Sequence, residues 1–354
     1  MQNQDILVVG LDDGHDHQKV YLGINKLTNK PMQFKMPSKA AIGQANMGSE
    51  EEVNGEIISV NGSLYTVSPS LQNWEDTKTE EFPTSILSKV LAYQAIRNAC
   101  KEYAIMGDKL IISSGLPVNR FYNIQTKEIN KKLTEEKKAN LLDFKGIFNK
   151  EDEKNKVKSL NITDHYVFCE GSSAYWDYIY DNNGNVSIDA EESGAYEGGA
   201  AIIDVGGRTT DCLIMNANGN NINGYRSDTK DFGVLNINEI IKNEMKEKFN
   251  IRFVNELSLK KAYMTGNYVI GQKSHDIRNI ILAAKQEYYK NIENLLDKTI
   301  GDGSDVPVVI LVGGGSYLLK DVLIERYGDS VVIPHDPEFA NARGFYKLIV
   351  NDIL

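Results

Sequence analysis

The stretch Ala200-Ala-Ile-Ile-Asp204-Val-Gly-Gly-Arg-Thr-Thr-Asp211 decides the fold of this chain. Its apolar start, residues 200–204, predicts a buried strand that ends at a carboxylate. Gly206 and Gly207 predict a tight turn, and the chain then runs on to Met215 as a returning strand. The stretch therefore predicts a hairpin that presents an aspartate and two glycines at its turn.

A second hairpin of the same layout lies near the N-terminus. Ile6 to Leu11 is typical of a buried strand, Asp12-Asp13-Gly14 of a turn, and Val20 to Gly23 of the returning strand. Seven residues after the leading aspartate come Lys19 in this copy and Asp211 in the other. Because the two copies are more than half the chain apart, we expect two domains that each open with this hairpin and face each other.

A third glycine-rich turn, Gly313-Gly314-Gly315-Ser316, follows the wholly apolar strand 308–312. Strands alternate with helices along the chain, which indicates the α/β class. Further strands are expected at 109–113 and 166–169, and helices from Thr84 or Ser85 to 96, at 172–180, 237–249 and 274–296, and from the N-cap Asp336 onward.

Two segments between these elements are polar. Residues 181–199 are rich in Asn, Gly, Glu and Asp, which predicts a surface loop. Residues 127–158 interleave lysines with carboxylates, which favours solvated helices and a loop. The alternative for the second segment is a contact surface for another chain or for a phosphate backbone.

Composition excludes several classes of protein. The chain has 354 residues, 41% hydrophobic and 25% charged, as in a soluble globular protein of two or three domains. Its net charge of −10 argues against strong, direct binding of nucleic acid. Three cysteines without metal-like spacing predict a reduced, cytoplasmic protein. The polar N-terminus predicts no signal peptide, and no apolar run reaches the length of a membrane span.

The three turns are chemically suited to a nucleoside triphosphate. Glycines let phosphates approach backbone N–H groups, while Lys19 and Thr209 add further donors. Asp12 and Asp204 can hold the water shell of Mg²⁺, which prefers oxygen ligands. The third turn lets a nucleoside lie against bare backbone. Each turn alone is more simply a hairpin or loop, so the prediction depends on all three meeting at one place.

Other signals are weaker. The sequence lacks the phosphate-binding P-loop, the dinucleotide fingerprint, the zinc-protease motif and the serine-hydrolase elbow. His15-Asp16-His17 could ligate a metal but is more simply turn polarity, since no further cluster supports it. Trp74 and Trp176 are most simply packing residues.

In this order, the three turns resemble the motifs of the actin, heat-shock chaperone and sugar-kinase superfamily. Within it the chain is most similar to the ParM (StbA) family of plasmid segregation, through Gly115-Leu-Pro117 with Tyr122, Glu136-Lys-Lys-Ala-Asn140, and Asp336-Pro-Glu-Phe-Ala-Asn-Ala-Arg-Gly344. The resemblance implies a two-domain actin-like (ribonuclease H-like) fold with a nucleotide cleft between the domains. Residues 1–165 with about 340–354 would form one domain, and 166–339 the other.

The resemblance also implies a function. Such proteins bind ATP or GTP with Mg²⁺, polymerise with themselves into polar filaments and hydrolyse the nucleotide there. An adaptor DNA-binding protein on a centromere-like site couples the filaments to plasmid DNA segregation, so the chain itself is expected to contact neither nucleic acid nor membrane. The alternatives are a metabolic kinase of the same fold and a non-segregating bacterial cytoskeletal or cell-division actin homologue.

Residue roles follow from the same resemblance. Glu170 would orient or deprotonate the attacking water, assisted by Asp204, although Glu170 could instead be a helix N-cap carboxylate. Asp12 and Asp204 would hold Mg²⁺ through water. The residues expected to contact the nucleotide are Asp12, Asp13, Gly14, His15, Lys19, Gly206, Gly207, Arg208, Thr209, Glu239, Lys242, Gly313, Gly314, Gly315 and Ser316. The His15-Asp16-His17 turn departs from the small or hydroxyl residues of relatives and adds a negative charge.

Overall fold

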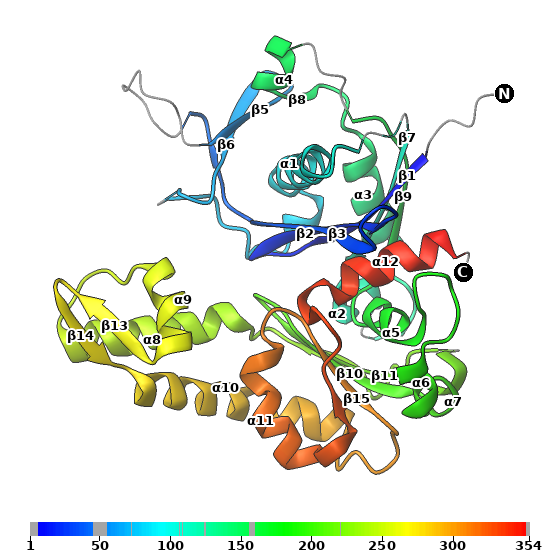
Figure 1. Cartoon of the computed structure of the whole chain (residues 1–354), viewed down its shortest axis with the longest axis vertical. Helices are drawn as coiled ribbons and strands as arrows, with labels where there is room; N and C mark the ends of the chain where they lie inside the picture. Colours follow the sequence, from blue (N-terminus) through cyan, green and yellow to red (C-terminus); the bar gives the residue numbers. More distant parts are fainter. Residues whose placement is uncertain are drawn as a thin grey trace.

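The computed structural model describes residues 6–351 except 45–54, 72, 106, 108, 124, 156–159 and 220. Within that part of the chain, two five-stranded sheets lie in separate halves of the molecule, each flanked by helices (Figure 1). We call the half with the first sheet, β3-β2-β1-β7-β9, the first lobe, and the half with β12-β11-β10-β15-β16 the second lobe. The predicted α/β class is confirmed.

The strands of the two sheets have short, mostly buried sequences. In the first lobe they are β1 (Ile6–Asp13), β2 (His17–Asn25), β3 (Lys30–Pro37), β7 (Lys109–Leu116) and β9 (Ile162–Cys169). In the second lobe they are β10 (Ala200–Val205), β11 (Thr210–Met215), β12 (Asp228–Lys230), β15 (Val309–Val312) and β16 (Val331–Val332). All residues of β10, β11 and β15 are buried, as expected for strands covered on both faces.

The two sheets share one pairing scheme. β1 pairs antiparallel with β2 and parallel with β7, and β10 pairs antiparallel with β11 and parallel with β15. In register, Asp12 lies opposite Lys19, and Asp204 lies opposite Asp211. The two predicted hairpins therefore exist, and the seven-residue spacing places each pair side by side across its hairpin.

Helices cover the sheets and link the lobes. The longer ones are α1 (Ile86–Glu102), α3 (Lys131–Leu142), α5 (Ser172–Ile179), α8 (Val234–Phe249), α9 (Glu256–Thr265), α10 (Arg278–Thr299), α11 (Ser316–Tyr327) and α12 (Ala340–Val350). The first lobe also carries a small sheet of β4 (Ala40–Ile42), β6 (Ser63–Val67), β5 (Glu56–Val60) and β8 (Ile147–Asn149), and the second lobe a hairpin of β13 (Asn267–Ile270) and β14 (Lys273–Asp276).

Helix α12 passes between the lobes and packs closely on both (Figure 1). A Cβ at Gly10 of β1 would lie 2.0 Å from the Ala342 carbonyl oxygen, and one at Gly344 would lie 1.9 Å from that of Ser173 on α5. Both glycines are therefore needed for backbones to approach so closely. The domain boundaries near 165 and 340 remain predictions; β9 runs on in the first sheet to Cys169.

Two local expectations were wrong, and a third held only in part. The segment 181–199 contains α6 (Ile188–Glu192) and α7 (Ala195–Gly198), because Ala190 and Ala195 pack into the core. Ser274 belongs to β14, and α10 begins only at Arg278.

The third expectation concerns Asp336, which stands at the predicted N-cap position before Pro337 but makes no side-chain cap bond. Its backbone is left-handed (φ 44°), its carboxylate accepts a hydrogen bond from Gln33, and a 3₁₀ turn (Pro337–Phe339) precedes α12. A tertiary contact has therefore replaced the predicted local cap. No helix among the described residues combines the length and apolarity needed to cross a membrane.

Candidate functional site

The first turn places a charged pair at the end of β1. Lys19 Nζ lies 2.7 Å from Asp12 Oδ2, with only 14% and 9% of the two side chains exposed. Burial alone would lower the pKa of Lys19, but Asp12 raises it to about 12. The carbonyl of Gly14 accepts hydrogen bonds from Ser38 Oγ (2.6 Å) and Gln18 Nε2 (3.3 Å). The turn is thus held from behind by its own lobe.

Asp13 is also paired, by a residue that the sequence did not point out. Lys137 of α3 lies 2.7 Å from Asp13 Oδ1, and 3% and 1% of the two side chains are exposed. Ser88 Oγ adds a longer hydrogen bond to Asp13 Oδ2 (3.4 Å). The prediction of solvated helices for 127–158 is therefore wrong at Lys137. The only signal was its place inside the matching segment Glu136–Asn140.

The second turn brings two carboxylates together. Burial, followed by the charges of Asp211 and Asp12, raises the pKa of Asp204 to about 7. Burial also raises the pKa of Asp211 to about 6, although hydrogen bonds from Thr229 Oγ1 (2.6 Å), Thr209 Oγ1 (3.0 Å) and the Val118 amide (3.3 Å) oppose the shift. Such a pair favours a nearby cation.

The third turn packs directly on the second hairpin. Gly313 has φ +86°, and a Cβ there would lie 2.4 Å from Asp204 Oδ1. The Gly315 amide donates to the Val205 carbonyl (3.0 Å), and a Cβ at Gly315 would lie 2.4 Å from the side chain of Val205. Gly314 has far more room, since a Cβ there would meet nothing closer than 3.9 Å. Ser316 Oγ is buried without a hydrogen-bond partner within the described chain.

The first and second turns touch across the lobes. A Cβ at Gly207 would lie 2.6 Å from the Cβ of Asp16. Arg208 binds Asp231 in its own lobe (2.8 Å) and donates to the Lys78 carbonyl in the other. The predicted meeting of the three turns is therefore present. The guanidinium of Arg208, however, is already bonded to these protein groups.

The first residues of α8 hold the second turn in place. The amides of Val234 and Leu235 donate to the carbonyls of Gly206 (3.0 Å) and Gly207 (2.9 Å). Gly233, just before the helix, would have its Cβ 2.5 Å from the Gly207 carbonyl oxygen. The turn is therefore fixed by α8 in the way that the first turn is fixed by Ser38 and Gln18.

Glu170 follows the last residue of β9, beside the first two turns. Its amide donates to the Leu116 carbonyl (2.9 Å), and a Cβ at Gly115 would lie 2.7 Å from Glu170 Cγ. Burial, then the charges of Asp12 and Asp211, raise the pKa of Glu170 well above its usual range. Its carboxylate caps no helix: α5 has Gly171 at its N-cap position and no side-chain cap bond.

The His15-Asp16-His17 turn is held by protein groups. The His15 ring bonds the Thr77 carbonyl and lies 5.0 Å from the Phe82 ring, and burial lowers its pKa. Burial alone would raise the pKa of Asp16, but the hydrogen bond from His17 (2.6 Å) lowers it to about 2. The negative charge that the sequence adds here is therefore paired with a histidine.

Glu239 and Lys242 lie together on α8. Lys242 Nζ contacts Glu239 Oε1 (2.9 Å) and Glu256 Oε1 of α9 (3.1 Å). Glu256 also contacts Lys39 of the first lobe (3.2 Å), whose ammonium lies 3.8 Å from the centre of the Trp74 ring. These charges form a second bridge between the lobes.

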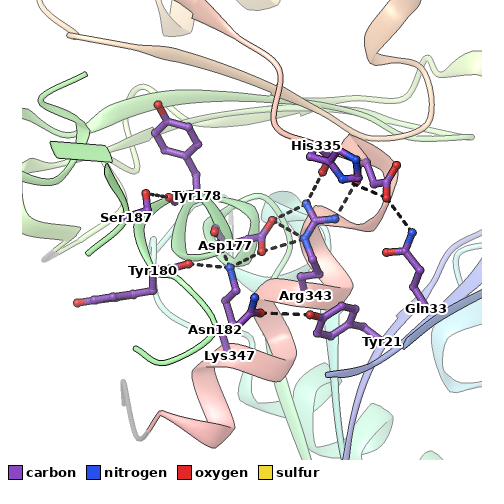
Figure 2. Close-up of polar contacts among 11 residues, drawn as sticks. Tyr21, Gln33, Asp177, Tyr178, Tyr180, Asn182, Ser187, His335, Arg343 and Lys347 are labelled. Carbon is purple, nitrogen blue, oxygen red and sulfur yellow. Dashed lines mark hydrogen bonds and ion pairs between the residues drawn. The ribbon is translucent and has the colours of Figure 1, made fainter. Parts of the chain in front are cut away.

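A buried ion-pair network holds α5 and α12 together where the chain passes between the lobes (Figure 2). Asp177 binds Arg343 Nη2 and Lys347 Nζ (2.7 and 2.8 Å). Burial alone would raise the pKa of Asp177, but these two cations lower it. Asn341 of α12 accepts from the Gly171 amide (2.9 Å) and donates to Asp204 Oδ2 (2.6 Å), so α12 connects the network to the site.

The residues present fit a magnesium nucleotide. Asp204 has a raised pKa beside two other carboxylates, a Cβ at Gly314 would meet nothing closer than 3.9 Å, and the buried Ser316 hydroxyl lacks a partner within the described chain. Among the described residues, no group of three His, Cys, Asp or Glu side chains is placed to ligate a metal directly. Mg²⁺ usually keeps several of its waters in proteins, so the carboxylates of Asp12 and Asp204 would suit contact through water.

Two family models match the chain. The N-terminal domain of actin-like proteins matches residues 10–172, and the C-terminal domain of the archaeal MreB-like actin homologue matches residues 202–325. Each match contains one of the two hairpins. No curated protein matches the sequence.

Solved structures share the whole fold. The native archaeal actin homologue Ta0583 is 23% identical with a TM-score of 0.72, covering 98% of this chain and 99% of its own. The subunit of a 15-stranded ParM filament from Clostridium botulinum is 20% identical with a TM-score of 0.68, covering 97% and 99%. ParM of Bacillus thuringiensis with ATP is 16% identical with a TM-score of 0.65, covering 98% and 99%. These likenesses confirm the predicted two-domain fold.

Proposed function

We propose that this chain, an actin-like protein whose structural neighbours are archaeal actin homologues and ParM proteins, is a nucleoside triphosphatase that assembles into filaments. The observation that carries the proposal is the meeting of three glycine turns around Asp12, Asp204 and Glu170. That arrangement offers phosphate donors, two carboxylates for a hydrated cation and a candidate base within one site.

The residues divide the work between the lobes. Lys19 and the amides of the first two turns would bind and orient the phosphates, and the third turn would receive the nucleoside. Asp12 and Asp204 would hold Mg²⁺ through water. When bound, Mg²⁺ neutralises phosphate charge and polarises the bond that breaks. Glu170 would hold the attacking water and accept its proton, a role that suits a carboxyl with a raised pKa.

Filament formation is proposed from the fold and from the relatives. The Clostridium botulinum ParM forms a 15-stranded filament, and solved relatives hold ADP or ATP. A nucleotide bound by turns of both lobes would fix their relative angle and so favour one subunit shape. Head-to-tail contacts between identical subunits need not close into a ring, and open assemblies of this kind are filaments.

Purified protein tests this proposal directly. We expect ATP or GTP with Mg²⁺ to increase light scattering and to drive the protein into a high-speed pellet, followed by phosphate release. Glu170→Ala should still pellet while releasing phosphate about 10²-fold more slowly. A metabolic kinase would stay dispersed under these conditions, and protein that neither binds nucleotide in calorimetry nor pellets would contradict the proposal.

We further propose that the filaments act in the cytoplasm to segregate plasmid DNA. The net charge of −10 disfavours direct contact with DNA, so a basic adaptor protein on a centromere-like site would make that contact. A gene for a small basic DNA-binding protein beside repeated DNA is expected next to the gene for this chain. In its presence, but not without it, filaments should co-sediment with the repeat DNA.

A further inference from the structure

Lys137 is the one buried charged residue of helix α3. The charged residues Lys131, Lys132, Glu135 and Glu136 of α3 are exposed, whereas the Lys137 side chain is 3% exposed. Burying an ammonium group is costly unless its donors are satisfied. An apolar side chain of similar volume commonly serves stability as well as a buried ion pair does. A role beyond stability would therefore explain a lysine at this position.

The contacts of Lys137 join two strand ends at the site. Its ammonium donates to Asp13 Oδ1 at the end of β1 (2.7 Å) and to the Gly115 carbonyl near the end of β7 (2.5 Å). Asp13 directly follows Asp12, the partner of Lys19 in the first turn.

The Gly115 contact leads to the other side of the site. Gly115 packs against Glu170, since a Cβ at 115 would lie 2.7 Å from Glu170 Cγ. The neighbouring Leu116 carbonyl accepts the Glu170 amide (2.9 Å). One cation thus connects the first phosphate turn to the backbone that carries Glu170.

We propose that Lys137 is a positioning residue for hydrolysis: by bonding both Asp13 and the Gly115 carbonyl, it fixes the Glu170 carboxylate relative to the first phosphate turn. The inference rests on the proposed triphosphatase function. Misplacing a reacting group by about 1 Å can cost about 10²-fold in rate. The loss of Lys137 should therefore lower kcat rather than nucleotide binding, because the lysine lies behind the turn and its ammonium is engaged by protein oxygens.

Steady-state hydrolysis by the full-length protein tests this split. Lys137→Met should lower kcat by about 10- to 100-fold and change KM by less than about threefold. Lys137→Arg, which can still reach both acceptors, should recover part of kcat. The matched control is Lys138→Met on the same helix, where the side chain is 35% exposed and lies 3.5 Å from Asp164; its kcat should equal that of wild type. An unchanged kcat in Lys137→Met, or a rise in KM alone, would overturn the proposal.

A double variant separates positioning from charge balance. Lys137→Met leaves Asp13 buried without a cation, so the variant can fail to fold. Lys137→Met with Asp13→Asn removes both charges and should melt close to wild type while kcat stays low. Recovery of kcat to within about threefold of wild type would mean that Lys137 only neutralises Asp13, and would overturn the proposal.

Hydrogen exchange distinguishes failure of this inference from failure of the proposed function. If wild type binds nucleotide but shows no turnover, hydrolysis is not its activity. In that case the Glu170 amide should still exchange faster in the double variant than in Lys138→Met. Equal protection of that amide in both variants would overturn the positioning role whatever the turnover.

Discussion

The two hairpins, Asp12 to Lys19 and Asp204 to Asp211, have the same backbone pairing and opposite electrostatics. In the first, the leading aspartate faces a lysine, and each charge satisfies the other. In the second, the leading aspartate faces another aspartate; burial raises both pKa values, and the charge of Asp211 adds to the rise at Asp204. The charges of the first hairpin are therefore balanced within it, whereas the second hairpin needs a cation or a proton to balance its carboxylates.

This difference assigns distinct tasks to equivalent positions. Under the proposed function, the completed ion pair would make the first turn a fixed support for phosphate. The uncompensated pair would make the second turn the part that responds to pH and, under the same proposal, to Mg²⁺. The same hairpin can thus carry an ion pair or a pair of carboxylates, depending on whether lysine or aspartate stands opposite the leading aspartate.

The largest expected contrast comes from removing the two facing residues. Lys19→Met leaves Asp12 nearly buried and unpaired and should lower the free energy of unfolding by about 3–5 kcal/mol. Asp211→Asn removes a like charge and should raise it by up to about 1 kcal/mol at pH 7.5. Urea unfolding of the nucleotide-free proteins measures both, and equal losses in the two variants would remove the contrast.

The next effect concerns Glu170, which feels one carboxylate from each hairpin. Glu170→Gln keeps the shape of the side chain but cannot accept a proton, so single-turnover hydrolysis should slow by about 10²-fold or more. Nucleotide affinity, measured by calorimetry, should stay within about threefold. A normal rate would show that neither hairpin directs a base at this position.

The pH dependence of stability should belong to the second hairpin. Because the folded pKa of Asp204 is about 7 and its unfolded value is lower, its protonation stabilises the fold at low pH, and this contribution is lost as the pH rises through 7. The nucleotide-free protein should therefore lose about 1–2 kcal/mol between pH 6 and 8. In Asp204→Asn the part of this slope centred near pH 7 should vanish, while Glu170, whose pKa is also raised, keeps its own contribution. The same slope in both proteins would place the titrating group elsewhere.

The smallest effect is expected at Arg208, where the second turn reaches the first lobe. Its partner Asp231 is 66% exposed, and such pairs contribute less than about 1 kcal/mol. Arg208→Ala should weaken nucleotide binding by less than about threefold, because the guanidinium is engaged by Asp231 and Lys78. Arg120→Ala is the control, since Arg120 likewise binds a backbone carbonyl, that of Glu80 (2.7 Å). If Arg208→Ala lowered nucleotide affinity more than tenfold, a direct contact between Arg208 and phosphate would be indicated.

Local patterns predicted the strands and turns because each is a short-range property. An apolar run followed by aspartate and glycine favours a buried strand and a tight turn, and both hairpins have that form. The same reasoning placed Asp336 before its helical turn but missed Gln33 as the partner of its carboxylate, and it missed Lys137, whose charge lies beneath the first turn. Neither partner is near in sequence, so no window along the chain could reveal it.

The amino-acid sequence by itself determined the fold class, the two matched hairpins and the residue types available at each turn. These features depend on glycine positions and on the spacing of apolar residues, which can be read from short stretches of the chain. Only the tertiary structure decided which charges are paired. It joined Asp13 to Lys137 and Asp204 to Asn341, and it turned Arg208 toward Lys78. Electrostatic energy depends on distance and burial, and both arise only when segments far apart in the chain pack together.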